Sequence, residues 1–101
     1  GVPQQIASLA AHYPFLEAAW AERLVTAYGT QAAMVLGDAH SLADCGQHFG
    51  MGLTTRELDY LRNSEWARTA EDVLWRRSKL GLHLTAGQCE AVRQAMEEYR
   101  A

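Results

Sequence analysis

The stretch from Glu65 to Thr85 constrains the fold of this chain most strongly, because it carries complete start and stop signals for one helix. Thr69 is a candidate N-cap, and Asp72 three residues later completes a pattern like a capping box. Basic residues toward the far end, among them Arg76, suit the negative end of the helix dipole. Gly81 follows the last turn, where a left-handed residue commonly ends a helix. The pattern predicts a helix that begins at Thr69 and ends before Gly81.

One face of this predicted helix is apolar apart from a single arginine. Ala70, Val73 and Leu74 share the i, i+3, i+4, i+7 stripe with Arg77. Three interpretations of Arg77 stay open. Its stem covers apolar surface while its head reaches water, or it forms an ion pair inside the fold, or it contacts another domain. The acids considered for the ion pair are Glu65 and Asp44.

The tryptophans are expected to differ in role. Trp20 and Trp66 are expected to anchor the core, as tryptophans on helices of small domains usually do. Trp75 lies off the apolar stripe, which indicates either a wide core or a surface that meets another domain. The neighbouring Arg76 and Arg77 carry planar guanidinium groups that suit carboxylates across an interface. Trp75, Arg76 and Arg77 are therefore our candidate domain-interface residues.

Apolar residues recur at helical spacing along most of the remaining chain. Further helices are predicted over residues 3–13, 16–28 and 30–36, and from Thr54 and Thr85 onward. Capping-box patterns mark the last two starts, where Thr54 is followed by Glu57 and Thr85 by Gln88.

Residues 37–52 are rich in glycine and small polar side chains. They are expected to form a loop, with one short helical turn after Ser41. No segment of the chain shows a convincing strand alternation. The sequence therefore predicts an all-α fold, a compact bundle of five or six short helices.

Composition limits the size and class of the protein. The 101 residues are 49% hydrophobic, which suffices for one small core and so predicts a single domain over residues 1–101. The net charge of −3 comes without a basic block, which argues against nucleic-acid binding. No apolar run is long enough to span a membrane, and no signal peptide is visible. Because the chain starts at Gly1 and not at methionine, we expect it to be part of a longer protein.

Motifs for catalysis or cofactor binding are missing from the sequence. The glycines at 46, 50 and 52 fit neither a dinucleotide fingerprint nor a P-loop. No nucleophile elbow or CxxC pair occurs, and two cysteines do not make a disulfide framework. We therefore assign no catalytic and no cofactor-binding residue, and expect free thiols in a reducing compartment.

One polar constellation lies in the loop of residues 37–52. His40, Cys45 and His48 are zinc-type ligands, with Asp38 and Asp44 nearby. Their spacing matches no strong zinc pattern, so we assign no metal ligand. The alternatives are a loop whose polar side chains tie down backbone groups, a loop that contacts a partner domain, and a metal site.

The segment EWARTAEDVLWRRSKLG closely resembles the C-terminal helical domain of FAD-dependent, aerobic glycerol-3-phosphate dehydrogenases. The matching residues are Glu65, Trp66, Thr69, Glu71, Asp72, Leu74, Arg76, Arg77, Ser78, Lys79 and Gly81. The AYG, LGDA, DCGQHFG and TTRELDYL stretches upstream are also similar to that family, so the resemblance covers nearly the whole chain.

The resemblance implies a parent enzyme that oxidises sn-glycerol 3-phosphate to dihydroxyacetone phosphate and passes electrons through FAD to membrane quinone. It implies that FAD and substrate bind in a large N-terminal region, and that this chain is a cap on that flavin domain, inactive alone. The expected partners are that N-terminal flavin domain and, in a homodimer, the second subunit. The expected location is the cytoplasm, with the parent peripheral to the cytoplasmic face of the inner membrane.

Two other functions compete with this interpretation. One is a free-standing helical protein-interaction module that binds a partner through the loop of residues 37–52. The other is a small metalloprotein built on His40, Cys45 and His48. The sequence also leaves open whether the parent is a dehydrogenase or the related oxidase, which passes electrons to oxygen.

Overall fold

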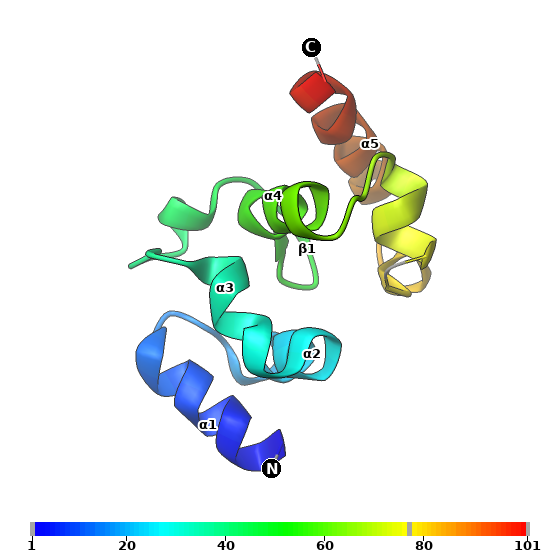
Figure 1. The fold of residues 1–101 in the computed structure, drawn as a ribbon. Coiled ribbons are helices and arrows are strands. Elements are labelled where there is room, and N and C mark those ends of the chain that lie inside the picture. The colour runs from blue at the N-terminus through cyan, green and yellow to red at the C-terminus, as the bar shows by residue number, and fades with distance from the viewer. Residues whose placement is uncertain (1, 77, 101) are drawn as a thin grey trace. The chain divides into compact units, whose positions relative to one another are not determined.

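The computed structural model of the protein describes residues 2–76 and 78–100. Arg77, one of the three predicted interface residues, lies outside the described residues. The chain divides into two compact units, Gly1–Gly46 and Gln47–Ala101 (Figure 1). The expectation of a single domain over residues 1–101 stays a prediction.

The first unit is built from short helices. In chain order they are α1 (Val2–His12), α2 (Ala18–Tyr28), the 3-10 turn η1 (Gly29–Gln31), α3 (Ala32–Leu36) and the 3-10 turn η2 (Ala43–Cys45). Helix α1 packs on α2 (Figure 1). Leu24 and Leu36 are fully buried. The buried Tyr13 hydroxyl donates a 2.7 Å hydrogen bond to the carbonyl oxygen of Gly37. This bond ties the end of α1 to the end of α3.

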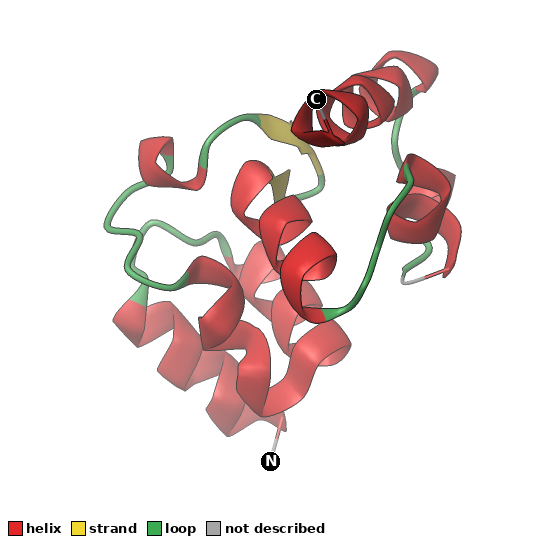
Figure 2. Ribbon diagram, turned by 45° about the horizontal axis from the view of Figure 1, so that its top comes forward, coloured by secondary structure: helices red, strands yellow, loops and turns green. Residues whose placement is uncertain are grey.

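The second unit combines a small hairpin with α-helices, a π-helical turn and a 3-10 turn. Its elements are β1 (His48–Gly50), β2 (Leu53–Thr54), α4 (Thr55–Ser64), the π-helical turn η3 (Asp72–Arg76), the 3-10 turn η4 (Leu80–Leu82) and α5 (Ala86–Arg100). Figure 2 shows the hairpin as the yellow segment among the red helices. Its buried apolar side chains include Phe49, Leu53, Leu58, Val73 and Val92.

The hairpin corrects the prediction that residues 37–52 form a loop throughout. Strands β1 and β2 pair antiparallel, with His48 opposite Thr54 and Gly50 opposite Leu53. Strands of three and two residues are too short to show the alternation that predicts a strand. The short helical turn expected after Ser41 is confirmed as η2.

A two-residue turn joins the strands. Its residues, Met51 and Gly52, both have positive φ angles, 55° and 76°, as a type I′ turn requires. The Gly52 N–H donates a 3.0 Å hydrogen bond to Nε2 of His48, which closes the turn. Methionine is an unusual residue for the first of these positions, so the turn carries no sequence signal.

The prediction of an all-α fold is confirmed, since five α-helices make up most of the regular structure in the described part of the chain. Among the residues described, no helix has the length and apolar character needed to cross a bilayer.

The capping box at Thr85 is confirmed by bonds of 2.9 and 3.1 Å exchanged with Gln88. The prediction that the Thr54 side chain caps α4 is wrong, because this buried side chain makes no capping hydrogen bond to the helix.

A largely buried arginine joins the two α-helices of the second unit. Only 8% of the Arg62 side chain is exposed, and its guanidinium pairs with the Asp59 carboxylate one turn earlier on α4. Its Nη1 lies 3.2 Å from the sulfur of Met96 on α5. The Arg62 guanidinium therefore forms one bond within α4 and a second bond from α4 to α5.

Candidate functional site

The segment that carries the predicted interface residues begins with a well-formed cap. The Asp72 N–H donates to Oγ1 of Thr69 at 3.2 Å, and the Thr69 N–H donates to Oδ2 of Asp72 at 3.1 Å. The Arg68 N–H donates to the same carboxylate oxygen at 2.9 Å. The capping box predicted at Thr69 is therefore confirmed, with one additional backbone donor.

The same backbone donors stabilise the ionised form of the Asp72 carboxyl. Hydrogen bonds from the backbone N–H of Arg68, and then of Thr69, lower the pKa of the Asp72 carboxyl below its ordinary value of 3.8. The Arg76 guanidinium, 3.6 Å from that carboxylate, lowers it further. The Arg76 side chain is nevertheless 81% exposed, so its remaining donors are open to another group.

The helix predicted between Thr69 and Gly81 differs from the structure in its geometry. The described segment forms the π-helical turn η3 over Asp72–Arg76, and a separate 3-10 turn, η4, follows. The apolar stripe is confirmed, because its three aliphatic members are each at most 3% exposed. They are Ala70, Val73 and Leu74.

Ser78 explains the early end of this helix. Its Oγ donates a 2.7 Å hydrogen bond to the carbonyl oxygen of Val73, an acceptor that a continuing helix would use. The same Oγ accepts the Leu80 N–H at 3.2 Å. The serine side chain therefore replaces the helical ladder and starts the next turn.

Gly81 does not take the left-handed conformation that was predicted, since its φ angle lies outside that region. The residue is small for a different reason: a Cβ atom at this position would overlap the six-membered ring of Trp75. Trp75 nevertheless keeps 51% of its surface exposed. The Trp75 indole therefore packs against Gly81 while about half of the residue's surface remains exposed.

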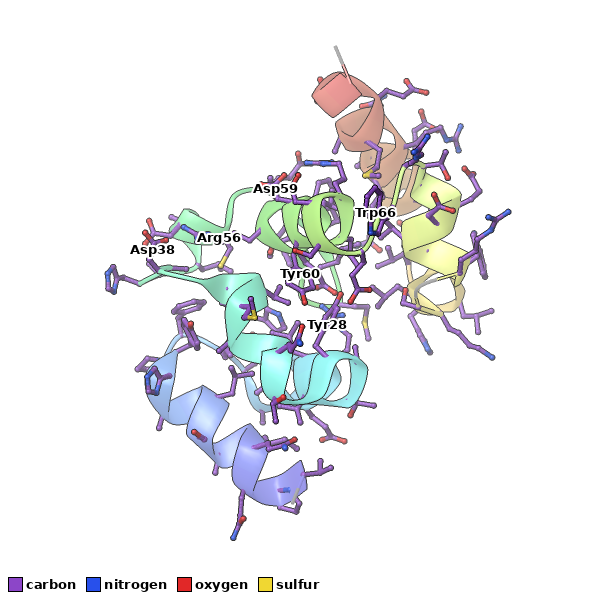
Figure 3. The ribbon with its side chains drawn as sticks, in the orientation of Figure 1. Tyr28, Asp38, Arg56, Asp59, Tyr60 and Trp66 are labelled. Carbon is purple, nitrogen blue, oxygen red and sulfur yellow. The ribbon has the colours of Figure 1, made fainter. Side chains whose placement is uncertain are left out.

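The other two tryptophans have opposite environments. Trp20 is only 8% exposed and meets Phe15 edge-on at 6.0 Å between ring centroids, so its expected role as a core anchor is confirmed. Trp66 is 77% exposed, and the same expectation is wrong for it. It lies in the connection between α4 and η3 (Figure 3). Its φ angle of +64° is rare for a bulky residue.

The structure thus leaves several large apolar side chains of the second unit exposed. They are Met51, Trp66, Trp75 and Leu82. Of these, the sequence predicted only Trp75 as an interface residue. Trp66 lies between the last turn of α4 and the cap at Thr69. This position between two helical segments was the available signal in the sequence that Trp66 is not part of a buried helical stripe.

Local hydrogen bonds involve four of the polar loop residues considered above, namely His40, Asp44, Cys45 and His48. The Cys45 thiol is fully buried and lies 3.8 Å from the Ser41 carbonyl oxygen, to which it donates. The Asp44 carboxylate accepts the His40 N–H at 2.8 Å, and His48 accepts its hydrogen bond in the hairpin turn. These contacts favour a loop that ties down its own backbone. Within the described ranges, no three His, Cys, Asp or Glu side chains are grouped to hold a metal ion.

The described residues do not fit a flavin site. A dinucleotide fold needs a parallel sheet with a glycine-rich turn between a strand and a helix. The sheet described here is an antiparallel hairpin of two strands.

A groove of about 280 Å³ in the first unit offers one titratable side chain, His12. The groove lining consists of Gln5, Ser8, Leu9, His12, Val25, Gly29, Thr30, Ala32 and Ala33.

Comparison with known proteins assigns the chain to a family. A family model described as the C-terminal domain of alpha-glycerophosphate oxidase matches residues 1–100. The chain belongs to this family. The match confirms the resemblance predicted from the segment around Glu65.

The relatives of this chain include two enzymes named for glycerol 3-phosphate. A glycerol-3-phosphate dehydrogenase from Pseudomonas aeruginosa is 49% identical over 80 residues, which are 79% of this chain and 16% of the relative. An aerobic glycerol-3-phosphate dehydrogenase from Escherichia coli is 41% identical over 93 residues, 92% of this chain and 19% of the relative. The chain therefore spans less than a fifth of the length of either enzyme.

A third relative acts on a different sugar-alcohol phosphate. A D-erythritol 1-phosphate dehydrogenase from Brucella abortus is 39% identical over 87 residues, which are 86% of this chain and 16% of the relative. Regions similar to this chain therefore occur in dehydrogenases that are named for different substrates.

Proposed function

We propose that this chain is the C-terminal domain of an FAD-dependent glycerol-3-phosphate dehydrogenase, which oxidises sn-glycerol 3-phosphate to dihydroxyacetone phosphate. The observation that carries the proposal is the family match over residues 1–100, together with two glycerol-3-phosphate dehydrogenases at 49% and 41% identity. In this proposal FAD and substrate bind outside the chain, and the chain has no catalytic group of its own.

The role of the domain in this proposal is to dock on the flavin domain through Trp75, Arg76 and Arg77. Trp75 is held by Gly81 while half of its surface stays open. Arg76 is anchored at Asp72 with most of its side chain exposed. Side chains that are oriented before binding lose less conformational entropy on docking. Arg77 belongs to the proposed set on the strength of its sequence position alone.

The proposal includes an electron acceptor and a location. The parent passes its electrons to quinone, resides in the cytoplasm and associates peripherally with the cytoplasmic face of the inner membrane. The competing acceptor is oxygen, as in an oxidase, and stopped-flow oxidation of the reduced parent by a short-chain quinone or by oxygen separates the two.

Assay of the purified full-length parent tests the activity. We expect a flavin absorption spectrum and reduction of an artificial electron acceptor that depends on sn-glycerol 3-phosphate. D-erythritol 1-phosphate is the comparison substrate, because one relative is named for it. A parent that lacks flavin, or that oxidises only the longer polyol phosphate, would contradict the proposal.

Substitutions in the full-length parent test the docking role. Trp75→Ala and Arg76→Ala are expected to lower flavin retention and melting temperature, because they remove a half-exposed indole and an exposed guanidinium. Arg77→Ala is the third variant, and Met34→Ala is the control at an exposed apolar side chain of the first unit. A residue whose variant leaves flavin content, melting temperature and turnover unchanged is not part of the interface.

A further inference from the structure

Trp66 combines an unfavourable backbone conformation with an unfavourable side-chain environment. Its φ angle of +64° places a Cβ close to the following carbonyl, an arrangement that L-residues avoid. Its indole is 77% exposed, more than any other large apolar side chain of the described chain. Neither feature stabilises the domain by itself.

The backbone conformation has a clear local cause. Helix α4 ends with the Glu65 N–H bonded to the Leu61 carbonyl oxygen at 3.1 Å, and the Ala67 N–H returns to the same oxygen at 3.0 Å. A left-handed residue at position 66 reverses the chain between these two bonds and brings Ala67 into the interior. Glycine is the residue usually found at this place after a helix.

The tryptophan side chain is therefore not explained by the turn that it occupies. Glycine would form the same turn without strain, and a polar side chain would suit the exposure. Tryptophan is, however, the residue that most often dominates the energetics of a protein interface, because it buries a large and rigid surface. A strained residue at an exposed position indicates a function outside the isolated domain.

We propose that Trp66 is an anchor residue, covered in the full-length protein by the polypeptide that precedes this domain. The proposal rests on the function proposed above, in which the chain is the C-terminal domain of a larger flavoenzyme. In the two glycerol-3-phosphate dehydrogenase relatives the matched region is 16% and 19% of the length, so most of each polypeptide lies outside it. A covalently attached partner faces the domain at a permanently high effective concentration.

The charges around Trp66 favour a protein surface over a lipid one. Within five residues of Trp66 along the chain, the charged residues are Arg62, Glu65, Arg68 and Glu71, which are of mixed sign, and the chain has 12 acidic against 9 basic residues. A surface that binds anionic lipid carries an excess of lysine and arginine around its aromatic residues. An apolar anchor within a mixed polar rim is instead typical of protein interfaces.

Hydroxyl-radical footprinting of the full-length parent, in solution without lipid, tests this proposal. If Trp66 is an anchor, it oxidises at least about 10-fold more slowly in the native parent than in the parent unfolded by guanidinium, as expected for a buried interface residue. Oxidation at nearly the unfolded rate would overturn the proposal. So would protection that develops only after phosphatidylethanolamine–phosphatidylglycerol vesicles are added, which would indicate a lipid surface.

The sign of a melting-temperature shift gives a second test in the same protein. Trp66→Gly relieves the left-handed strain, so it raises the melting temperature if the indole contacts nothing and lowers it by several degrees if the indole is an anchor. Met51→Gly relieves the same type of strain in the hairpin turn and is the comparison variant. A rise for Trp66→Gly equal to that for Met51→Gly would overturn the proposal.

Flavin content and glycerol-3-phosphate oxidation of the wild-type parent are measured alongside. If these are absent while Trp66 is protected, the proposed activity fails and the anchor stands. If they are present while Trp66 is exposed, the anchor fails and the activity stands.

Discussion

The indole ring of Trp75 lies against the backbone of Gly81, with no room between them for a Cβ atom. This contact joins the end of η3 to η4, the two short turns that stand where the sequence predicted one helix. It also fixes an indole that remains half exposed. Gly81 thus allows the Trp75 indole to approach the backbone closely. It does not form a left-handed helix end.

Substitution of Gly81 tests this contact. We expect Gly81→Ala to lower the free energy of unfolding by about 1–3 kcal/mol, because the new methyl group must displace the indole. Gly87→Ala is the control, since a Cβ there comes no closer than 3.9 Å to Oγ1 of Thr85 and alanine favours the helix α5. Urea unfolding measures both. Equal effects of the two substitutions would show that the indole is not held by Gly81.

Asp72 makes the stability of the second unit depend on pH. The folded-state pKa of this carboxyl is below its ordinary value of 3.8. The stabilisation is therefore complete above that value and is lost as pH falls through the folded-state pKa. Asp72→Ala is expected to lower the free energy of unfolding by about 1 kcal/mol at pH 7, with a smaller difference from the wild type under more acidic conditions.

Glu71→Ala is the matched control for Asp72, because it removes an adjacent acid that is exposed on the same turn. Chemical unfolding between pH 7 and pH 3 measures both variants against the wild type. A difference between wild type and Asp72→Ala that stays constant over this range would contradict the assigned hydrogen bonds.

The hairpin depends on Gly50. Its φ angle is +122°, and a Cβ atom there would lie 2.8 Å from side-chain atoms of both Gln88 and Leu84. Gly50→Ala is therefore expected to lower the free energy of unfolding by more than 2 kcal/mol, from backbone strain and overlap together. Gly29→Ala is the control, since its φ is also positive but a Cβ there meets nothing within 4 Å. If the two substitutions cost the same in thermal unfolding, the hairpin does not pack on the start of α5.

Arg62 is expected to contribute more than an ordinary surface charge. Arg62→Ala removes the bonds to Asp59 and Met96 and leaves a gap between α4 and α5, which we expect to cost about 1–3 kcal/mol. Arg93→Ala is the control, because its i, i+3 pair with Glu90 is about half exposed on both sides. Such a pair contributes roughly 0–1 kcal/mol. Guanidinium unfolding that ranks the two equally would contradict a linking role for Arg62.

Helix positions and caps could be predicted because their causes are local. The bonds between Thr69 and Asp72, and between Thr85 and Gln88, join residues three apart, and the sequence displays both partners. The buried stripe of Ala70, Val73 and Leu74 follows from helical spacing in the same way. These features do not depend on what the rest of the chain does.

The features that the sequence did not predict depend on side-chain contacts or on unusual residues. Ser78 ends a helix by bonding to the Val73 carbonyl, although its sequence context favours continuation. Met51 occupies a turn position for which asparagine or glycine is the usual signal. Trp66 occupies a left-handed cap that usually needs glycine, so its exposure could not be inferred from residue type.

We propose that this domain is a required structural part of a flavoenzyme. The most direct test is the flavin-to-protein ratio of the purified parent with and without residues 1–101, together with glycerol-3-phosphate-dependent acceptor reduction. Our account predicts that flavin and turnover are both lost in the truncated protein while its secondary structure persists. Full flavin content and unchanged turnover after the deletion would contradict it and leave the domain an accessory module.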